Sequence, residues 1–153
     1  MASPTSPLAA SEPDSYVIFK GTAIKISGDK KKVPWFIEST AANHITSDPS
    51  LITELVPMSN KVVDAGIGKG MQVCGIGKVK TEAVVLDDVW FVPELSSKNL
   101  VSVDQVTNDP DLIITIAGTG CHVKKMSDGS VVGSAHLRPD NKYEVDFLRI
   151  HQN

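Results

Sequence analysis

Cysteine, aromatic side chains and long apolar runs are all scarce in this chain of 153 residues. Two cysteines, Cys74 and Cys121, are too few for a disulfide framework, and they suit a reducing compartment. The longest apolar stretches, such as Leu112–Ala117, fall far short of the ~20 residues that a membrane-spanning helix needs, so we expect no membrane partner. Residues 1–12 show no basic segment followed by an apolar one, the pattern of a secretion signal. We therefore expect a cytoplasmic protein, with the nucleus as a further location.

An excess of basic charge is also missing. The chain has 15 Lys and Arg residues against 18 Asp and Glu residues, which gives a formal net charge of -3. No dense basic run is available to neutralise a phosphate backbone. Nucleic acid is therefore not expected as a partner.

The apolar residues that are present favour strands. Hydrophobic residues make up 41% of the chain, enough to bury a core, and Val and Ile clearly outnumber Leu and Ala. β-Branched side chains suit a pleated sheet better than a helix. The 11 Gly and 9 Pro residues separate short apolar runs, as in a barrel or sandwich of short strands. We expect a flexible leader at residues 1–15, one mainly β domain at residues 16–149, and a tail at residues 150–153.

Alternation of apolar and polar residues predicts short strands along most of the chain. These strands are expected at Val17–Lys20, Thr22–Ile26, Val33–Glu38, Lys61–Ala65, Met71–Cys74, Val73–Lys80, Thr81–Leu86, Val89–Val92, Leu112–Ala117, Cys121–Met126, Ser130–His136 and Lys142–Leu148. The first two could also form one bent strand around Gly21. A loop is expected at Ser39–Ser50. One short helix is predicted near residues 97–106, capped by Ser97 and ended by Asn108–Pro110.

Common catalytic and ligand-binding patterns are not matched. The cluster Gly66-x-Gly68-x-Gly70 lacks the following helix that a phosphate-binding loop needs, so a glycine-rich hairpin is the better interpretation. Cys121 and His122 are adjacent and point to opposite faces of a strand, which leaves no ligand pair for a metal. Ser39, His44 and Asp48 lie in one short loop, which cannot easily align a catalytic triad. We expect no metal and no cofactor, and we expect His44 to satisfy backbone groups.

The segment from Trp35 to Thr46 is the most informative part of the sequence. It reads Trp-Phe-Ile-Glu-Ser-Thr-Ala-Ala-Asn-His-Ile-Thr. It resembles the active-site segment of the retropepsin-like aspartic protease domain of copia-type LTR retrotransposon polyproteins, where Trp and two apolar residues precede Asp-Ser-Gly-Ala and a loop with His-Ile/Met-Thr. Further blocks resemble the family in the same order: Val63-Asp64-Ala65-Gly66, Val73-x-Gly75-x-Gly77-x-Val79, Leu86-x-x-Val89-x-x-Val92-Pro93-x-Leu95, Asn99-Leu100-Val101-Ser102-Val103-x-Gln105, Cys121-His122-Val123 and Tyr143-Glu144-Val145.

The resemblance extends from about Val33 to Val145 and implies a small retropepsin-like, mostly antiparallel β-barrel with one short helix. In family proteases an aspartate from each of two subunits forms a carboxylate pair that shares one proton. Glu38 stands at this position and carries one methylene more than aspartate, which moves its carboxyl group by more than ~1 Å. Thr40 stands where the family has glycine, in a tight turn. A degenerate motif, Glu38-Ser39-Thr40, is therefore expected to have lost catalysis.

A binding role remains after catalysis is removed. Grooves of this type hold extended peptides through main-chain hydrogen bonds, which do not require the catalytic carboxylates. We expect a protein or extended-peptide partner, and the candidate binding residues are Glu38, Ser39, Thr40, Ala41, Gly66, Gly68 and Gly70. Two alternatives stay open: a weak dimeric endopeptidase that uses Glu38 from each subunit, and a passive fragment without a partner. A homodimer stays open as well.

Overall fold

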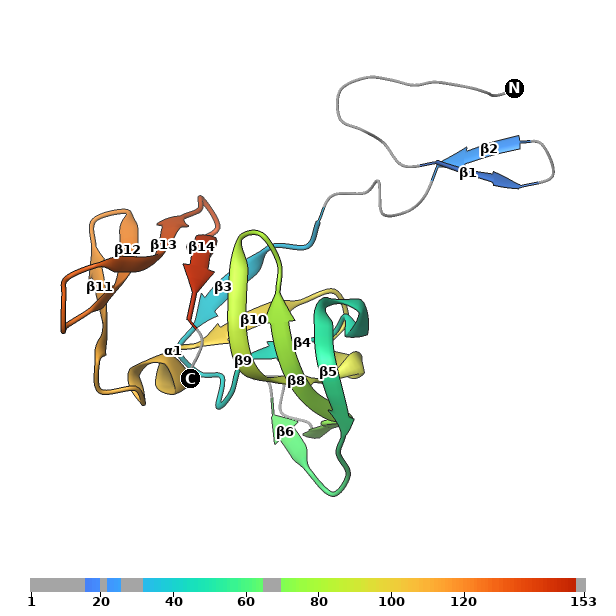
Figure 1. Ribbon diagram of the computed structural model, residues 1–153, viewed down its shortest axis with the longest axis horizontal. Helices are drawn as coiled ribbons and strands as arrows, with labels where there is room; N and C mark the ends of the chain where they lie inside the picture. Colours follow the sequence, from blue (N-terminus) through green and yellow to red (C-terminus); the bar gives the residue numbers. More distant parts are fainter. Residues whose placement is uncertain (1–15, 20–21, 26–31, 65–69, 151–153) are drawn as a thin grey trace. The chain divides into compact units, whose positions relative to one another are not determined.

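The computed structural model describes residues 16–19, 22–25, 32–64 and 70–150 (Figure 1). The chain divides into two compact units, Met1–Val33 and Pro34–Asn153. In the first unit, β1 (Tyr16–Phe19) and β2 (Thr22–Lys25) pair in antiparallel register. The sequence was compatible with one bent strand or with two strands in this region, and the structure has two strands. The expected leader at residues 1–15 lies outside the described residues, and so does the expected tail at residues 150–153 apart from Ile150.

Strands dominate the second unit, as the sequence predicted. Its main sheet contains β3 (Trp35–Glu38), β4 (Ile45–Thr46), β5 (Ile52–Pro57), β8 (Gly75–Lys80), β9 (Val84–Phe91), β10 (Asn99–Ser102), β11 (Leu112–Ala117), β12 (Gly120–Lys125), β13 (Val131–Leu137) and β14 (Tyr143–Arg149). Within the described residues these ten strands lie in the order β11-β12-β13-β14-β3-β10-β4-β9-β8-β5.

The middle of this sheet closes on itself. Besides its pairings with β13 and β3, β14 pairs with β9, so β14, β3, β10, β4 and β9 form a ring of paired strands. Three pairings in this ring are parallel: β3 with β10, β4 with β9, and β9 with β14. The other pairings are antiparallel, in agreement with the expected mostly antiparallel architecture.

A small hairpin and three short helical turns complete the described chain. β6 (Val62–Asp64) and β7 (Gly70–Gln72) form the hairpin, with Asp64 opposite Gly70. The glycine-rich hairpin predicted from the sequence is therefore confirmed in its stem, whereas its tip lies outside the described residues. The helical turns are η2 (Pro49–Leu51), η3 (Pro93–Leu95) and α1 (Val103–Thr107).

The predicted helix at residues 97–106 is wrong in its first half. Asn99–Ser102 is strand β10, paired with β3 on one side and β4 on the other. The helix α1 starts only at Val103, and its N-cap is Ser102, whose hydroxyl oxygen accepts a hydrogen bond from the backbone N–H of Gln105. Burial of this segment between two strands overrides its helical periodicity. Asn108 ends the helix as expected.

The predicted loop at Ser39–Ser50 is also more structured than expected. It contains β4, two residues that pair with both β10 and β9, and the start of η2. The following strand β5 was missed altogether, because only its first residue, Ile52, is buried and its burial does not alternate. Periodicity cannot detect such an exposed edge strand.

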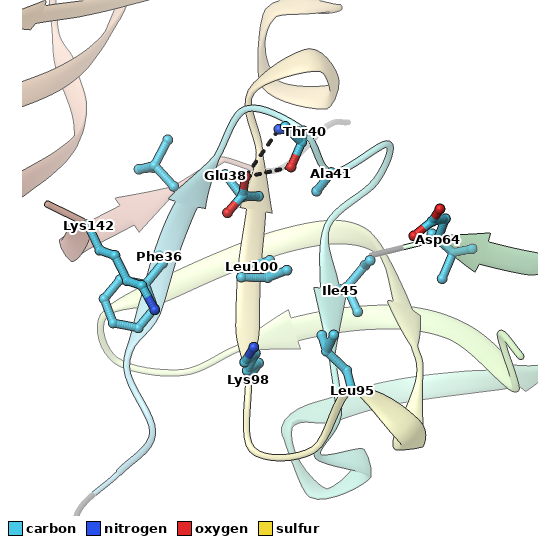
Figure 2. A pocket seen from close by; sticks show the side chains of 12 residues that line it. Phe36, Glu38, Thr40, Ala41, Ile45, Asp64, Leu95, Lys98, Leu100 and Lys142 are labelled. Atoms are coloured by element: carbon cyan, nitrogen blue, oxygen red, sulfur yellow. Dashed lines mark hydrogen bonds between the residues drawn. The ribbon is translucent and has the colours of Figure 1, made fainter. Parts of the chain in front are cut away.

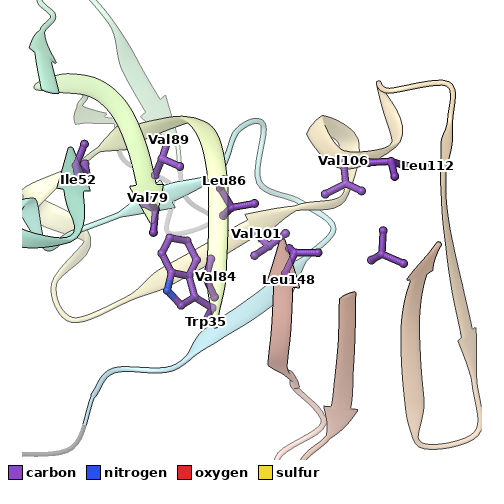
Figure 3. Packing of buried hydrophobic residues seen from close by; sticks show 11 residues of the cluster. Trp35, Ile52, Val79, Val84, Leu86, Val89, Val101, Val106, Leu112 and Leu148 are labelled. Carbon is purple, nitrogen blue, oxygen red and sulfur yellow. The ribbon is translucent and has the colours of Figure 1, made fainter. Parts of the chain in front are cut away.

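The buried residues form two clusters. In the larger cluster Trp35 lies among Val79, Val84 and Leu86 (Figure 3). Its other members are Ile52, Val89, Val101, Val106, Leu112, Val123 and Leu148. The smaller cluster consists of Ile45, Val63, Met71, Val73, Val92 and Leu95, and it joins the β6–β7 hairpin to the sheet. No helix within the described part of the chain is long and apolar enough to cross a membrane.

Candidate functional site

A pocket of about 310 Å³ lies where the end of β3 faces β4, β6 and the beginning of β10 (Figure 2). Apolar side chains make up much of its lining: Phe36, Ile37, Ala41, Ile45, Val63, Leu95 and Leu100. Three of these, Ile45, Val63 and Leu95, belong to the smaller buried cluster, so the base of the pocket is a packed surface. Its volume is at the lower end for ligand pockets, which suits one or two side chains of a ligand.

β3 supplies one wall of the pocket because its side chains alternate. Trp35 faces the larger cluster, and Phe36 and Glu38, on the other face, line the pocket; Ile37 packs against the larger cluster and also lines the pocket. The carboxylate of Glu38 turns back onto the following turn, where its Oε2 accepts hydrogen bonds from the hydroxyl (2.6 Å) and the backbone N–H (3.3 Å) of Thr40 (Figure 2). Thr40 therefore binds one oxygen of the Glu38 carboxylate within the same turn.

The sequence-derived candidates are partly brought together here. Glu38, Thr40 and Ala41 line the pocket, whereas Ser39 is exposed and does not. Gly70 begins β7, where a side chain would meet Val62 of the neighbouring strand. Gly66 and Gly68 lie outside the described residues.

Three charged residues of the pocket were missed in the sequence. Asp64 comes from β6, Lys98 immediately precedes β10, and Lys142 immediately precedes β14. Lys142 places its ammonium nitrogen 5.7 Å from the ring centre of Phe36. Phe36 was missed as well, although alternation along the predicted strand would place it on the face opposite Trp35. No local sequence pattern indicated Lys98 and Lys142, because they reach the pocket through the pairing of β10 and β14 with β3, which is distant in the sequence.

His44 has a structural role beside the pocket. It is buried, and its Nδ1 accepts a hydrogen bond (2.9 Å) from the backbone N–H of Ser102. Its own backbone N–H donates to the side-chain oxygen of Gln105 (2.6 Å), and the hydroxyl of Ser102 donates to the carbonyl of Ala41 (2.8 Å). Burial lowers the pKa of His44 to about 4, which keeps the imidazole neutral at neutral pH. The prediction that His44 satisfies backbone groups is confirmed.

The other constellations considered in the sequence are not assembled. Asp48 accepts hydrogen bonds from Ser50 and caps η2, so His44 and Asp48 serve different backbone segments. Cys121 is buried and the adjacent His122 is exposed. Burial raises the pKa of the Cys121 thiol, which disfavours the thiolate that a metal would require. Among the described residues no group of three or more His, Cys, Asp and Glu side chains could hold a metal ion.

Comparison with known proteins gives one match. Residues 35–110 match the model of the family described as "Pol polyprotein, beta-barrel domain". The matched stretch runs from β3 to α1 and contains every pocket residue described here except Lys142. This match supports a retrotransposon Pol-derived domain. No curated protein and no solved structure matches significantly.

Proposed function

We propose that this retrotransposon-derived domain is of the copia type, has lost peptidase activity, and holds an extended protein segment in the pocket beside β3. The observation that carries the proposal is the pocket itself: an apolar base with charged residues around it, at the end of the strand that resembles the active-site strand of the proteases. A site of this size accommodates one or two side chains of a longer chain.

The hairpin next to the pocket supports an extended ligand. β6 contributes Val63 and Asp64 to the lining, and within the described residues it pairs with β7 only. A strand that is paired on one side has backbone N–H and C=O groups on its other edge. An extended peptide can pair with such an edge while it inserts a side chain into the neighbouring pocket.

The geometry at Glu38 supports the loss of catalysis. Aspartic proteases need two carboxylates close enough to share a proton and activate a water molecule. The Glu38 carboxylate is instead bound to the hydroxyl of Thr40 at 2.6 Å, within its own turn. Thr40 thus occupies one of the two oxygens of the Glu38 carboxylate.

A peptidase assay tests the catalytic part of the proposal. Full-length protein incubated with unfolded casein between pH 3.5 and pH 7 is expected to give cleavage indistinguishable from the blank, because the carboxylate is held within its own turn. Glu38→Gln is expected to give the same result. A known aspartic protease serves as the positive control for the substrate.

The alternative is a weak endopeptidase in which two subunits each contribute Glu38. It is favoured by one observation, that Glu38 does line the pocket. It requires a dimer, which sedimentation of the same sample measures. Cleavage that accompanies the dimer and disappears in Glu38→Gln would replace our proposal with this one.

Replacement of Phe36 by serine tests the binding part. A display library of random twelve-residue peptides, selected on the immobilised full-length protein, is expected to yield enriched peptides. Phe36→Ser is expected to retain these peptides at least tenfold less well, because it removes a large apolar surface from the pocket. Phe147→Ser is the matched control, since Phe147 is also half-buried and stacked by an arginine (Arg149, 5.1 Å) but does not line the pocket. Equal loss in both variants would mean that the pocket is not the binding site.

A further inference from the structure

Two lysine side chains of the pocket have no carboxylate partner among the described residues: Lys98 and Lys142 form no ion pair there. Arg138, which also stacks on Phe36 at 5.1 Å, differs because it is bound to Glu144 at 3.4 Å. The positive charge that remains available at the pocket is therefore that of the two lysines.

The charges of the pocket are separated along the strands. β3 and β10 run parallel, with Glu38 opposite Ser102. Lys98 precedes β10, so about 13 Å of extended backbone separates it from the level of Glu38. The backbone of Lys142 comes just before Tyr143, which lies opposite Ile37, but its ammonium nitrogen lies 5.7 Å from the ring centre of Phe36. In Figure 2 this nitrogen lies beside Phe36 and Lys98 lies below Leu100, and Glu38 and Asp64 lie apart from both ammonium groups. The pocket therefore has a positive end and a negative end on either side of its apolar base.

Leu100 sets the spacing between the apolar base and the positive end. It lines the pocket two residues after Lys98, and residues two apart on an extended chain project to the same face about 7 Å apart. Both edges of β10 are already paired, with β3 and β4, so an extended ligand does not add to this strand; where it crosses the pocket parallel to β10 it has the same spacing of side chains. A carboxylate two residues from an apolar side chain would then meet Lys98 while the apolar side chain meets Leu100.

We infer that the bound segment carries an aspartate or glutamate two residues from a leucine-sized apolar residue, with Lys98 and Lys142 receiving the acid. This inference rests on the proposed binding function and adds the chemistry of the partner. Charge-assisted hydrogen bonds to the lysines favour the acid at one end. At the other end, two residues beyond the apolar residue, an acid would face Glu38 and is disfavoured by repulsion between like charges.

The peptide selection described above tests this inference when the enriched sequences are read. For the wild-type protein we expect enrichment of Asp or Glu two positions from Leu, Ile, Met or Phe, and depletion of acids on the other side of that apolar residue. The double variant Lys98→Gln/Lys142→Gln is expected to lose the acidic preference and keep the apolar one. Lys124→Gln/Lys125→Gln is the matched control, because both lysines are exposed on β12 and neither lines the pocket.

A direct affinity measurement completes the test. For a synthetic copy of an enriched peptide, replacing its acid by the corresponding amide is expected to weaken binding about tenfold to the wild type and not at all to Lys98→Gln/Lys142→Gln. Enrichment without an acidic preference, or a preference that survives in the double variant, would overturn this inference and leave the proposed function standing. Absence of any enrichment would overturn both. Equal affinity for free 4-methylpentanoate would assign the pocket to small acids instead of peptides.

Discussion

Replacing Gly77 by alanine is expected to destabilise the protein by about 2–3 kcal/mol, as for other additions to a tightly packed site. Gly77 lies in β8 directly against β5. A β-carbon there would meet the side chain of Ile52 and would lie 2.7 Å from the backbone carbonyl oxygen of Thr53. Because one of these atoms is backbone, β5 has to move away from β8. Thermal unfolding monitored by circular dichroism is expected to show a melting temperature lower by about 5–10 °C.

Gly120→Ala is the matched control for this substitution. Gly120 is also a strand glycine, at the start of β12, but the nearest atom to a β-carbon there is 3.9 Å away. This variant is expected to unfold within about 0.5 kcal/mol of the wild type. Equal stability of the Gly77 and Gly120 variants would mean that β5 does not pack against β8 as described.

The same contact explains what the sequence could and could not predict about this part of the fold. Alternation in Val73-x-Gly75-x-Gly77-x-Val79 correctly predicted a strand, and Gly75 and Gly77 are both buried against β5. β5 itself escaped prediction. Its ladder with β8 is interrupted between Thr53 and Val56, and Glu54 has a positive φ of 57°. The two glycines of β8 therefore mark the close approach of β5, although the sequence of β5 itself has no regular strand pattern.

The misassigned helix has a different cause. Leu100, Val103 and Val106 recur at helical spacing, and this periodicity is genuine for α1. Asn99–Ser102 became a strand because β3 and β4 supply ladder partners on both sides. Those partners are more than 50 residues away in the chain, and local periodicity contains no information about them.

In the candidate site, too, local features were predictable from the sequence and long-range contacts were not. The turn that contains Glu38 and Thr40 was identified from its motif, because a motif is local. The hydrogen bond between these two side chains adds a physical argument for the loss of catalysis that we propose, which the motif alone did not contain. Lys98 and Lys142 reach the pocket through strand pairing over long range, and so the chemistry inferred for the partner depends on the structure.

Replacing His44 by alanine is the second substitution with a large expected effect. It leaves the buried N–H of Ser102 without an acceptor and leaves a cavity, which together are expected to cost about 3–4 kcal/mol. His44→Asn is the matched variant, because its side-chain oxygen replaces Nδ1 as acceptor while it does not titrate. We expect a loss of about 1–2 kcal/mol for asparagine, from reduced packing alone. Equal losses in the two variants, measured by urea unfolding at pH 7.5, would show that the hydrogen bond contributes nothing.

The acid dependence of stability follows from the same imidazole. Burial lowers the pKa of His44 in the folded protein to about 4, from its ordinary value of 6.5. Between these two pH values the unfolded chain binds a proton that the folded protein does not. The free energy of unfolding therefore falls as the pH falls, by about 3 kcal/mol in all by pH 4, and this contribution is fully present above pH 6.5.

His44→Asn isolates the contribution of His44 to the pH dependence of the free energy of unfolding, because asparagine does not bind a proton in this pH range. A backbone hydrogen bond from Ser130 holds the pKa of Asp128 below its usual range, so Asp128 also weakens the fold in acid, but it does so equally in both proteins. The stability advantage of the wild type over His44→Asn is expected to shrink and then reverse between pH 7 and pH 4.5. An advantage that stays constant over this range would mean that the folded protein accepts a proton on His44 as readily as the unfolded chain does.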